Sequence, residues 1–434
     1  MTAQPHVIVC GGGLAGIGAA VEATLRGARV TLVERRPFLG GKAYSFDLDG
    51  TEIDNGQHVF LGCCSAYLWL LARLGVMSQV ILPARLRVVV RDRAGITGVL
   101  AASSLPAPLH IGPSFARFPL LSPVEKARAV RALAVLTLMR EGDRLALDDM
   151  SFGDWLDAHG QRAGAIERFW DLIVLPTCND RSDRVSASLA AYVFREGLFR
   201  TRGGSAIGRS SVGLTTLVDA PTRRLIESTG GAVRASTSIV RASSGSVDLG
   251  DGSRLEGDAV ILALPANRAA AVSPAAVGTL APLGSSPIVN LHLWFDRPVM
   301  DEEFMAVVDS PVQWLFGYPD PSGPGQRLVV SVSGARDEVD RPKASLVESF
   351  VDEIRMLFPD AARARLTRSH VVKEPHATFA AAPGQARLRP GPRTADPSIF
   401  LAGSWTNTGW PATMEGAVRS GMIAARLSLG DRLT

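Results

Sequence analysis

The sequence has few cysteines and no long apolar run. Its only cysteines are Cys10, Cys63, Cys64 and Cys178. Two of them are adjacent and none has the spacing of metal ligands, so we expect neither a disulfide framework nor a bound metal. No uninterrupted apolar stretch reaches about 18 residues, which argues against a membrane-spanning helix. The first apolar run, 6–10, has no basic region before it and ends in glycines, so we expect a cytoplasmic protein without a signal peptide.

The sequence also has little net charge and few lysines. The formal charge is +4 over 434 residues, and only Lys42, Lys126, Lys343 and Lys373 among the 46 basic residues are lysine. No cluster of basic residues of the kind that binds nucleic acid is present, so we expect no nucleic-acid partner. A mildly basic protein can still rest on an anionic membrane surface, so peripheral contact with the inner face of the cell membrane stays open.

What the chain does have is glycine, concentrated near its two ends. The stretch "HVIVCGGGLAGIGAA" predicts a buried strand over 6–10 and a helix over 14–26, and "ARVTLVE" predicts a second strand over 28–34. Gly11, Gly13 and Gly16 form a G-x-G-x-x-G turn between strand and helix, where backbone N–H groups can face a pyrophosphate.

An acidic residue completes the nucleotide motif. Glu34 ends the second strand, 18 residues after Gly16, where a carboxylate can accept hydrogen bonds from both ribose hydroxyls. The pattern predicts an ADP-containing dinucleotide. The following "ERRPFLGGKAYSF" adds a Gly-Gly pair and Lys42, which favours a longer ligand than NAD, with Lys42 as a point charge near phosphate.

The other specialised stretch is "GWPATMEGAVRSGMIAARLSL" near the C-terminus. Pro411 suits the start of a helix over 413–428, and Ala412–Met414 would present unpaired N–H groups at its first turn. A positive helix terminus suits the negatively charged N1–C2 edge of a reduced flavin. Small residues such as Gly416 and Gly421 would let this helix approach something flat or backbone-like. FAD is long enough to need both ends of the chain.

Three quoted stretches resemble a known group of proteins. "GGGLAG…VERRPFLGGKAYSF", "DNGQHVFLGC" and "LAGSWTNTGWPATMEGAVRSG" are similar to the amine oxidase/phytoene desaturase flavoprotein superfamily, and within it to the hydroxysqualene dehydroxylases. The resemblance implies an α/β fold: a Rossmann-like, glutathione-reductase-like FAD-binding domain and a discontinuous mixed α+β substrate-binding domain. The expected FAD-binding domain comprises 1–85, 205–265 and 392–434, and the expected substrate-binding cap domain comprises 86–204 and 266–391.

The motifs and the resemblance together predict the cofactor-binding residues. Lys42 stands where the family usually has arginine, and Ser404 stands where it has an acid that contacts the flavin ribityl or phosphate region. The resemblance also implies that the Ile239 backbone meets the adenine. The expected FAD-binding residues are Gly11, Gly13, Leu14, Ala15, Gly16, Glu34, Arg35, Gly41, Lys42, Ala43, Gln57, His58, Ile239, Gly403, Ser404, Pro411, Ala412, Thr413 and Met414.

The resemblance further implies a reaction, removal of the hydroxyl of hydroxysqualene to give squalene with reduced FAD as hydride donor, in hopanoid and isoprenoid biosynthesis. Such a site needs an apolar tunnel, a proton donor and exclusion of water. We expect the donor to be His58, Asp54 or His376, with Gln57 orienting. The alternatives are a carotenoid desaturase or isomerase acting on another polyene and, of a different class, a lipid-binding escort without redox chemistry.

Overall fold

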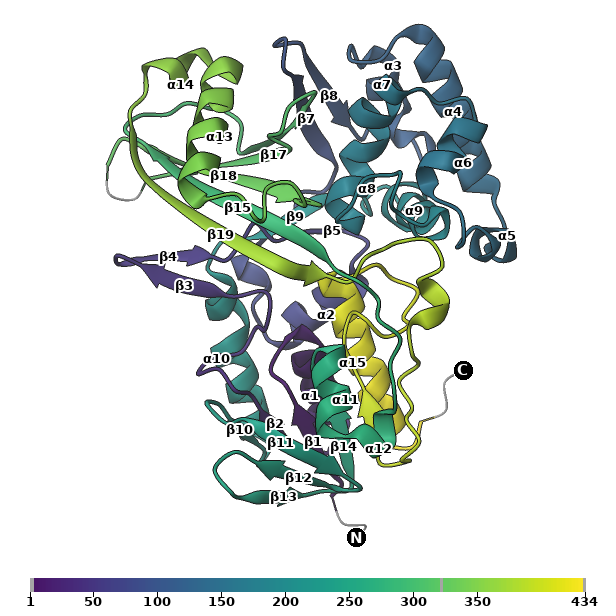
Figure 1. Ribbon diagram of the computed structural model, residues 1–434, viewed down its shortest axis with the longest axis vertical. Coiled ribbons are helices and arrows are strands. Elements are labelled where there is room, and N and C mark those ends of the chain that lie inside the picture. The colour runs from purple at the N-terminus through teal and green to yellow at the C-terminus, as the bar shows by residue number, and fades with distance from the viewer. Residues whose placement is uncertain (1–3, 321–322, 432–434) are drawn as a thin grey trace.

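The computed structural model describes residues 4–320 and 323–431, so the expected domain ends at 1–3 and 432–434, and 321–322 within the cap, lie outside the described residues. A parallel five-stranded sheet lies at one end of the elongated molecule, and helices with a second large sheet lie at the other (Figure 1). The division into two domains at the expected boundaries stays a prediction.

The parallel sheet has the strand order β10-β2-β1-β14-β20, and every neighbouring pair is parallel. The predicted strand–helix–strand unit at the N-terminus is confirmed, and its helix ends one residue earlier than expected, before Gly27 at φ 86°. The strands are β1 (His6–Cys10), β2 (Arg29–Val33), β10 (Ala232–Arg234), β14 (Ala259–Leu262) and β20 (Ile399–Leu401).

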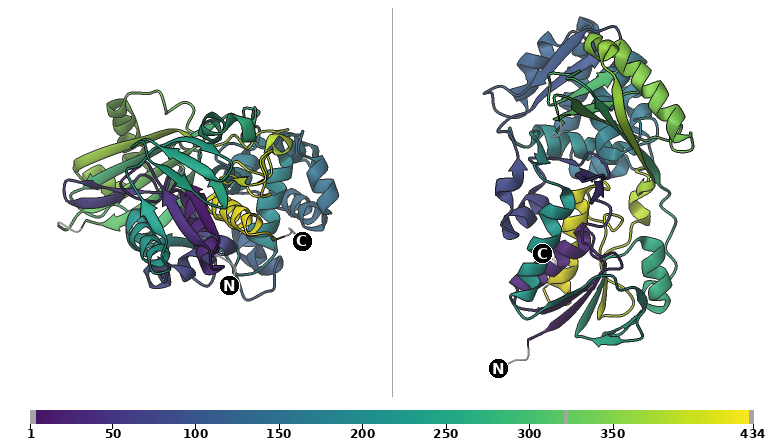
Figure 2. Two further views of the ribbon diagram at one scale, coloured as in Figure 1. Left: turned by 90° about the horizontal axis from the view of Figure 1, so that it is seen from below. Right: turned by 90° about the vertical axis from the view of Figure 1, so that its left-hand side faces the viewer.

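Because these strands run parallel, their carboxyl ends meet at one edge of the sheet, where ligands bind in open α/β folds. The glycine turn after β1, Glu34 after β2 and Gly403 after β20 therefore come together, although the last is far from the first two in sequence. Helix α1 (Leu14–Leu25) and helix α15 (Met414–Ser428) both begin at this edge. The purple helix α1 and the yellow helix α15 lie side by side (Figures 1 and 2).

Helix α15 packs directly on α1. A Cβ on Gly421 would stand 1.9 Å from the Ala15 carbonyl oxygen, and a Cβ on Gly18 would stand 3.0 Å from the Val418 carbonyl oxygen. We expected the small residues of α15 to allow a close approach to something flat or backbone-like. At Gly421 the closely approached group is the backbone of α1. Smaller elements complete this end: α2 (Ser65–Arg73), α10 (Leu214–Glu227), α11 (Ala266–Val272), α12 (Pro274–Val277), the hairpin β3 (Ser45–Leu48) and β4 (Thr51–Asp54), and the sheet of β11 (Ile239–Ser243), β12 (Ser246–Leu249) and β13 (Arg254–Glu256).

The second large sheet has seven strands in the order β19-β15-β18-β17-β16-β7-β8, antiparallel except for the β16–β7 pair. One face packs on α13 through apolar residues that alternate along the strands, such as Leu291 and Val330. The opposite face is directed at β4, β5 and the loop between them. The elements are β7 (Arg87–Asp92), β8 (Thr97–Ala101), β15 (Ser286–Phe295), β16 (Phe304–Val308), β17 (Trp314–Pro319), β18 (Gln326–Ser333), β19 (Leu366–Thr378), α13 (Lys343–Leu357) and α14 (Pro359–Arg363).

The segment from about 115 to 200 is mainly helical. Its core is aromatic, with Phe152 stacked on Trp155 and in edge contact with Trp170. A small sheet of β5 (Val59–Leu61), β9 (Ile207–Ser210) and β6 (Val80–Ile81) connects this segment with the parallel sheet. The helices are α3 (Gly112–Arg117), α4 (Pro123–Leu138), α5 (Glu141–Ala146), α6 (Phe152–Ala158), α7 (Ala163–Ala165), α8 (Asp171–Cys178) and α9 (Ala187–Val193), with π-helical turns at Ile166–Trp170 and Phe194–Phe199 and 3₁₀ turns at Met77–Gln79, Leu109–Ile111 and Ala386–Leu388.

Candidate active site

The glycine turn after β1 contains one open position. A Cβ on Gly11, which has φ 110°, would stand 2.4 Å from the Ala263 carbonyl oxygen, and one on Gly16 would stand 1.8 Å from the Gly11 carbonyl oxygen. A Cβ on Gly13 would meet nothing closer than 3.7 Å. No side chain caps the N-terminus of α1, where Leu14 and Ala15 form the first turn. The turn therefore has open space at Gly13 beside free N–H groups, which fits a pyrophosphate.

Glu34 is held at the end of β2 with its carboxylate buried and fixed. Its Oε2 accepts from the Gly12 N–H at 2.7 Å and its Oε1 accepts from the Arg36 N–H at 2.8 Å. Each carboxylate oxygen keeps a further lone pair for a ribose hydroxyl. The Thr237 N–H donates to the Glu34 carbonyl at 2.9 Å, which brings the start of β11, and with it Ile239, beside this carboxylate. Arg35 points outward and is exposed.

The second glycine pair packs on the first turn. The Gly40 N–H donates to the Gly12 carbonyl at 2.8 Å, and a Cβ on Gly41, at φ 65°, would stand 2.6 Å from the Gly13 Cα. Lys42 lies next to this contact, but its Nζ donates to the His376 carbonyl and, at 3.1 Å, to the Ala377 carbonyl. Lys42 thus ties the N-terminal turn to the end of β19. Ala43 is buried and closes the turn by donating to the Gly40 carbonyl at 3.2 Å.

The C-terminal stretch forms a fixed loop between β20 and α15. The Gly403 N–H donates to Ser420 Oγ at 2.8 Å, and Arg389 donates to the carbonyls of Ser404 at 3.1 Å and Thr406 at 2.6 Å. Burial lowers the pKa of Arg389 to about 10, and the buried guanidinium remains a cation at neutral pH. The loop therefore lies at the same edge of the sheet as the glycine turn after β1, and the Ser404 carbonyl already accepts a hydrogen bond.

The N-terminus of α15 stays accessible at this edge. Pro411 is buried, and Ala412, Thr413 and Met414 are partly exposed. Thr413 Oγ1 caps the helix by accepting from the Gly416 N–H at 3.1 Å. The remaining N–H groups of the first turn can face a negatively charged ligand.

Glu415, one residue into α15, has a role that sequence reasoning missed. Its side chain is fully buried, and its carboxylate accepts from the backbone N–H groups of Ala66 at 3.0 Å and Tyr67 at 2.8 Å, which cap helix α2. Arg419 pairs with it from the next turn. The acid of this motif therefore joins α15 to α2.

The "NGQH" segment is organised by Asn55, which is buried. Its Nδ2 donates to the Lys42 carbonyl at 3.0 Å and to Glu374 Oε1 at 3.3 Å, and its Oδ1 accepts from His58 Nε2 at 3.1 Å. This residue connects the second glycine turn, β19 and the loop after β4. It thereby fixes where Gln57 and His58 stand between the two sheets.

The three expected proton donors have different surroundings. Asp54 accepts from Ser45 Oγ at 2.7 Å and from the Leu214 N–H at 2.9 Å, so it caps α10, and burial raises its pKa. Desolvation lowers the pKa of His58 to about 4, so its imidazole is neutral at pH 7. His376 is exposed at the end of β19, with Nδ1 2.8 Å from Ser285 Oγ. Each of the three side chains therefore already makes a hydrogen bond within the protein, and this bond would compete with proton donation to a substrate.

The face of the seven-stranded sheet opposite α13 contributes a residue that sequence reasoning missed. Tyr318 of β17 donates its hydroxyl to Gln57 Oε1 at 2.6 Å. An apolar pocket of about 210 Å³ lies beside this contact, since Val59 and Phe316, each two residues from one of the partners, line it. Ile81, Leu82, Ile207 and Phe304 complete its walls, and Arg209 and Glu303 pair at 3.1 Å on its polar side.

The glycine turns, Glu34 and the N-terminus of α15 meet at one edge of the parallel sheet, an arrangement that fits the class of dinucleotide-binding oxidoreductases. A family model described as flavin containing amine oxidoreductase matches residues 14–428, so the chain belongs to that family and is an FAD-dependent oxidoreductase. Within the described residues no group of three or more metal-ligating side chains is found. None of the helices in 4–320 and 323–431 is long and apolar enough to cross a bilayer.

Relatives with assigned names agree with this class. The chain is 31% identical to the hydroxysqualene dehydroxylase of Sinorhizobium fredii, covering 99% of both chains, and 30% identical to that of Rhodopseudomonas palustris, again covering 99% of both. It is 27% identical to the 15-cis-phytoene desaturase of Solanum lycopersicum, covering 98% of this chain and 78% of that protein.

Solved structures share the fold. An oxidoreductase from Methanosarcina mazei has a TM-score of 0.74 at 17% identity, with 96% of this chain and 99% of that chain covered. A putrescine oxidase with bound putrescine has a TM-score of 0.72 at 18% identity, with 99% of both chains covered. At this identity the likeness establishes the fold alone, and it confirms the expected α/β class with a Rossmann-like FAD domain.

Proposed function

We propose that this protein reductively removes the hydroxyl group of hydroxysqualene to give squalene. The observation that carries the proposal is the similarity, over 99% of both chains, to hydroxysqualene dehydroxylases from two organisms. The phytoene desaturase relative is longer and less similar. A desaturase or isomerase acting on another polyene is therefore the second candidate.

The geometry around the cofactor edge supports a reaction of an apolar substrate. When bound, reduced FAD supplies a hydride to an electron-poor carbon. Most residues that line the pocket beside Gln57 are aliphatic or aromatic, and such a lining suits part of an isoprenoid chain. The polar groups at this place are the Tyr318 hydroxyl, the Gln57 amide and the ion pair of Arg209 with Glu303. They lie where a substrate hydroxyl would need partners.

We further propose that the cofactor is held by the residues expected from the sequence, and that the chain divides into the expected FAD-binding and substrate-binding domains. The open position at Gly13, the fixed Glu34 carboxylate and the partly exposed start of α15 support the first assignment. The two large sheets, each with its own apolar core, support the second.

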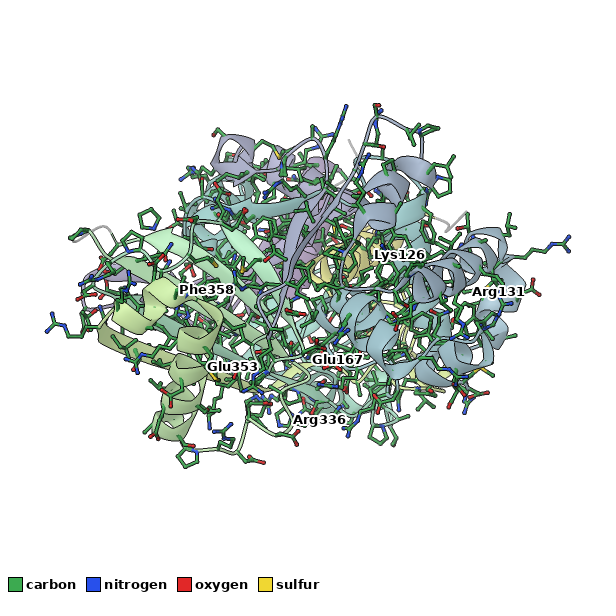
Figure 3. All side chains as sticks on the ribbon, turned by 90° about the horizontal axis from the view of Figure 1, so that it is seen from above. Lys126, Arg131, Glu167, Arg336, Glu353 and Phe358 are labelled. Atoms are coloured by element: carbon green, nitrogen blue, oxygen red, sulfur yellow. The ribbon has the colours of Figure 1, made fainter. Side chains whose placement is uncertain are left out.

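Peripheral contact with an anionic membrane is the remaining part of the proposal. Helix α4 exposes Val124, Val130 and Leu138, with exposed fractions of 59%, 54% and 81%. Lys126 and Arg131 lie on the same helix (Figure 3), which is at the end of the molecule away from the parallel sheet (Figure 1). Exposed apolar side chains among cations favour binding to an anionic lipid surface, from which a polyisoprenoid can enter the protein.

Product analysis separates the two candidate activities. The purified flavoprotein, reduced under argon, is incubated separately with hydroxysqualene and with phytoene, and the extracts are analysed by mass spectrometry. We expect squalene from the first incubation and unchanged phytoene from the second, and we expect no desaturation when the oxidised protein is used. If desaturated phytoene is found and squalene is not, the protein is a desaturase and the proposed function is wrong.

A further inference from the structure

Tyr318 belongs to a row of side chains that crosses four strands of the second sheet. The register pairs Arg368 of β19 with Trp294 of β15, Trp294 with Arg327 of β18, and Arg327 with Tyr318 of β17. All four point to the face opposite α13, because side chains at alternate positions of the same strands, such as Leu293, Leu315 and Leu328, pack in the core beneath α13. Arg209 of β9, which lines the pocket, lies beside Tyr318 at the end of this row.

The row alternates guanidinium groups with aromatic rings. The Arg368 Cζ lies 4.8 Å from the Trp294 ring centroid, and the Arg327 Cζ lies 5.9 Å from the Trp294 centroid and 4.7 Å from the Tyr318 centroid. The Arg209 Cζ lies 6.0 Å from the Tyr318 centroid. Two cations therefore flank the Tyr318 ring, and they stabilise negative charge on it.

The Tyr318 hydroxyl stands at the junction of three features. It donates to Gln57 in the loop that also holds His58 and that the sequence assigns to the flavin. Phe316, two residues earlier on the same face of β17, lines the apolar pocket. An isoprenoid alcohol with its chain in that pocket would therefore bring its hydroxyl to the Tyr318–Gln57 contact.

We propose that Tyr318 is the catalytic proton donor to the leaving hydroxyl, and that Arg327 is a positioning residue that stabilises the resulting phenolate. This inference rests on the proposed function. The Tyr318 O–H proton passes to the substrate oxygen, the C–O bond breaks with its electron pair on oxygen, and water departs. The allylic carbon accepts the hydride that reduced FAD supplies. The Tyr318 phenolate then takes a proton from solvent, so one alcohol, one hydride and one proton give one hydrocarbon and one water.

Three other ionisable side chains between the two sheets are less suited to this step. The imidazoles of His58 and His292 have pKa values lowered by burial to about 4 and about 3, so neither is protonated at neutral pH. Asp54 is occupied as the cap of α10. The pKa of Tyr318 is raised by burial, against the lowering effect of Arg209, Arg327 and the Gln57 hydrogen bond, so the phenol is protonated throughout the neutral range.

The test removes one oxygen atom. Tyr318→Phe keeps the ring between its two guanidinium groups, and we expect the rate of squalene formation in a single anaerobic turnover to fall about 100-fold or more. Flavin content, melting temperature and the affinity for the alcohol should change little; this affinity is measured on the oxidised protein from the change in the flavin spectrum. The matched control is Tyr67→Phe, which removes a phenol from the buried core beside Phe60 of β5 and should leave the turnover rate unchanged.

A second readout does not depend on turnover. The tyrosinate absorbance of the wild type minus that of Tyr318→Phe gives the titration of this one phenol, faced by Arg209 of β9, Arg327 of β18 and Asp54 of β4. Removing the cation in Arg327→Gln should move this titration upward by about one pH unit. If the wild type forms squalene and the Tyr318→Phe rate is within threefold of the wild-type rate, the assignment of Tyr318 is overturned while the proposed function stands. No squalene from the wild type would overturn both.

Discussion

Gly13 and Gly16 allow the nucleotide assignment to be tested with a pair of alanine substitutions. Gly13 has φ −74° and ψ 174°, a conformation that alanine adopts without strain, and the added Cβ would lie 3.7 Å from its nearest neighbour, an ordinary van der Waals distance. We expect the free energy of unfolding of the apoprotein to change by no more than about 0.5 kcal/mol in Gly13→Ala. At Gly16 the added Cβ would stand 1.8 Å from the Gly11 carbonyl, so Gly16→Ala should destabilise the apoprotein by several kcal/mol.

The two variants separate folding from cofactor binding. If Gly13 faces the pyrophosphate, its added methyl group occupies space that a phosphate oxygen needs, at a cost of about 1–3 kcal/mol, which weakens FAD binding by about 5-fold to 150-fold. Urea unfolding of the apoprotein gives the first quantity, and quenching of flavin fluorescence gives the second. A Gly13→Ala protein that unfolds like the wild type and binds FAD equally well would refute the placement of the pyrophosphate.

Two further predictions concern buried ionisable side chains. Glu415→Gln retains the shape of the side chain but weakens the cap of α2 and the pairing with Arg419, so it should lower the free energy of unfolding by about 1–3 kcal/mol in urea titrations; an unchanged midpoint and slope would contradict this role. Because the folded-state pKa of His58 is about 4 and the unfolded value is about 6.5, the unfolded chain binds this proton more readily. The resulting stability is fully present above about pH 6.5 and falls by up to about 3 kcal/mol as the pH drops to about 4. Relative to the wild type, His58→Gln should lose less stability between pH 7 and pH 4, and parallel pH profiles of the two proteins would count against the shift.

The sequence predicted the half of the site that depends on local pattern. A strand, a glycine turn, a helix and an acid at the next strand end are all encoded within about 30 residues, so β1, α1 and β2 followed directly from spacing. Because parallel strands share one carboxyl edge, even the meeting of the two chain ends was accessible. The expected contacts of these residues with FAD stay predictions.

The roles of residues that depend on a partner far away in the sequence could not be predicted from local spacing. Tyr318 and Gln57 are separated by 261 positions, and nothing in the alternation of β17 says which face meets the "NGQH" loop. Lys42 has a long side chain whose position does not reveal that two carbonyls of β19 hold it. Glu415 lies inside a stretch that the sequence relates to flavin, yet its partners are on α2. In each case the determining fact is tertiary packing.

In the proposed reaction, hydroxysqualene accepts the hydride of the reduced flavin. The most direct measurement is a stopped-flow experiment under anaerobic conditions, in which the photoreduced protein is mixed with hydroxysqualene and the visible absorbance of oxidised flavin is followed. We predict that this absorbance returns at a rate that saturates with substrate, with one squalene formed per flavin. A flavin that stays reduced in the presence of the alcohol, while oxygen reoxidises it normally, would contradict the account.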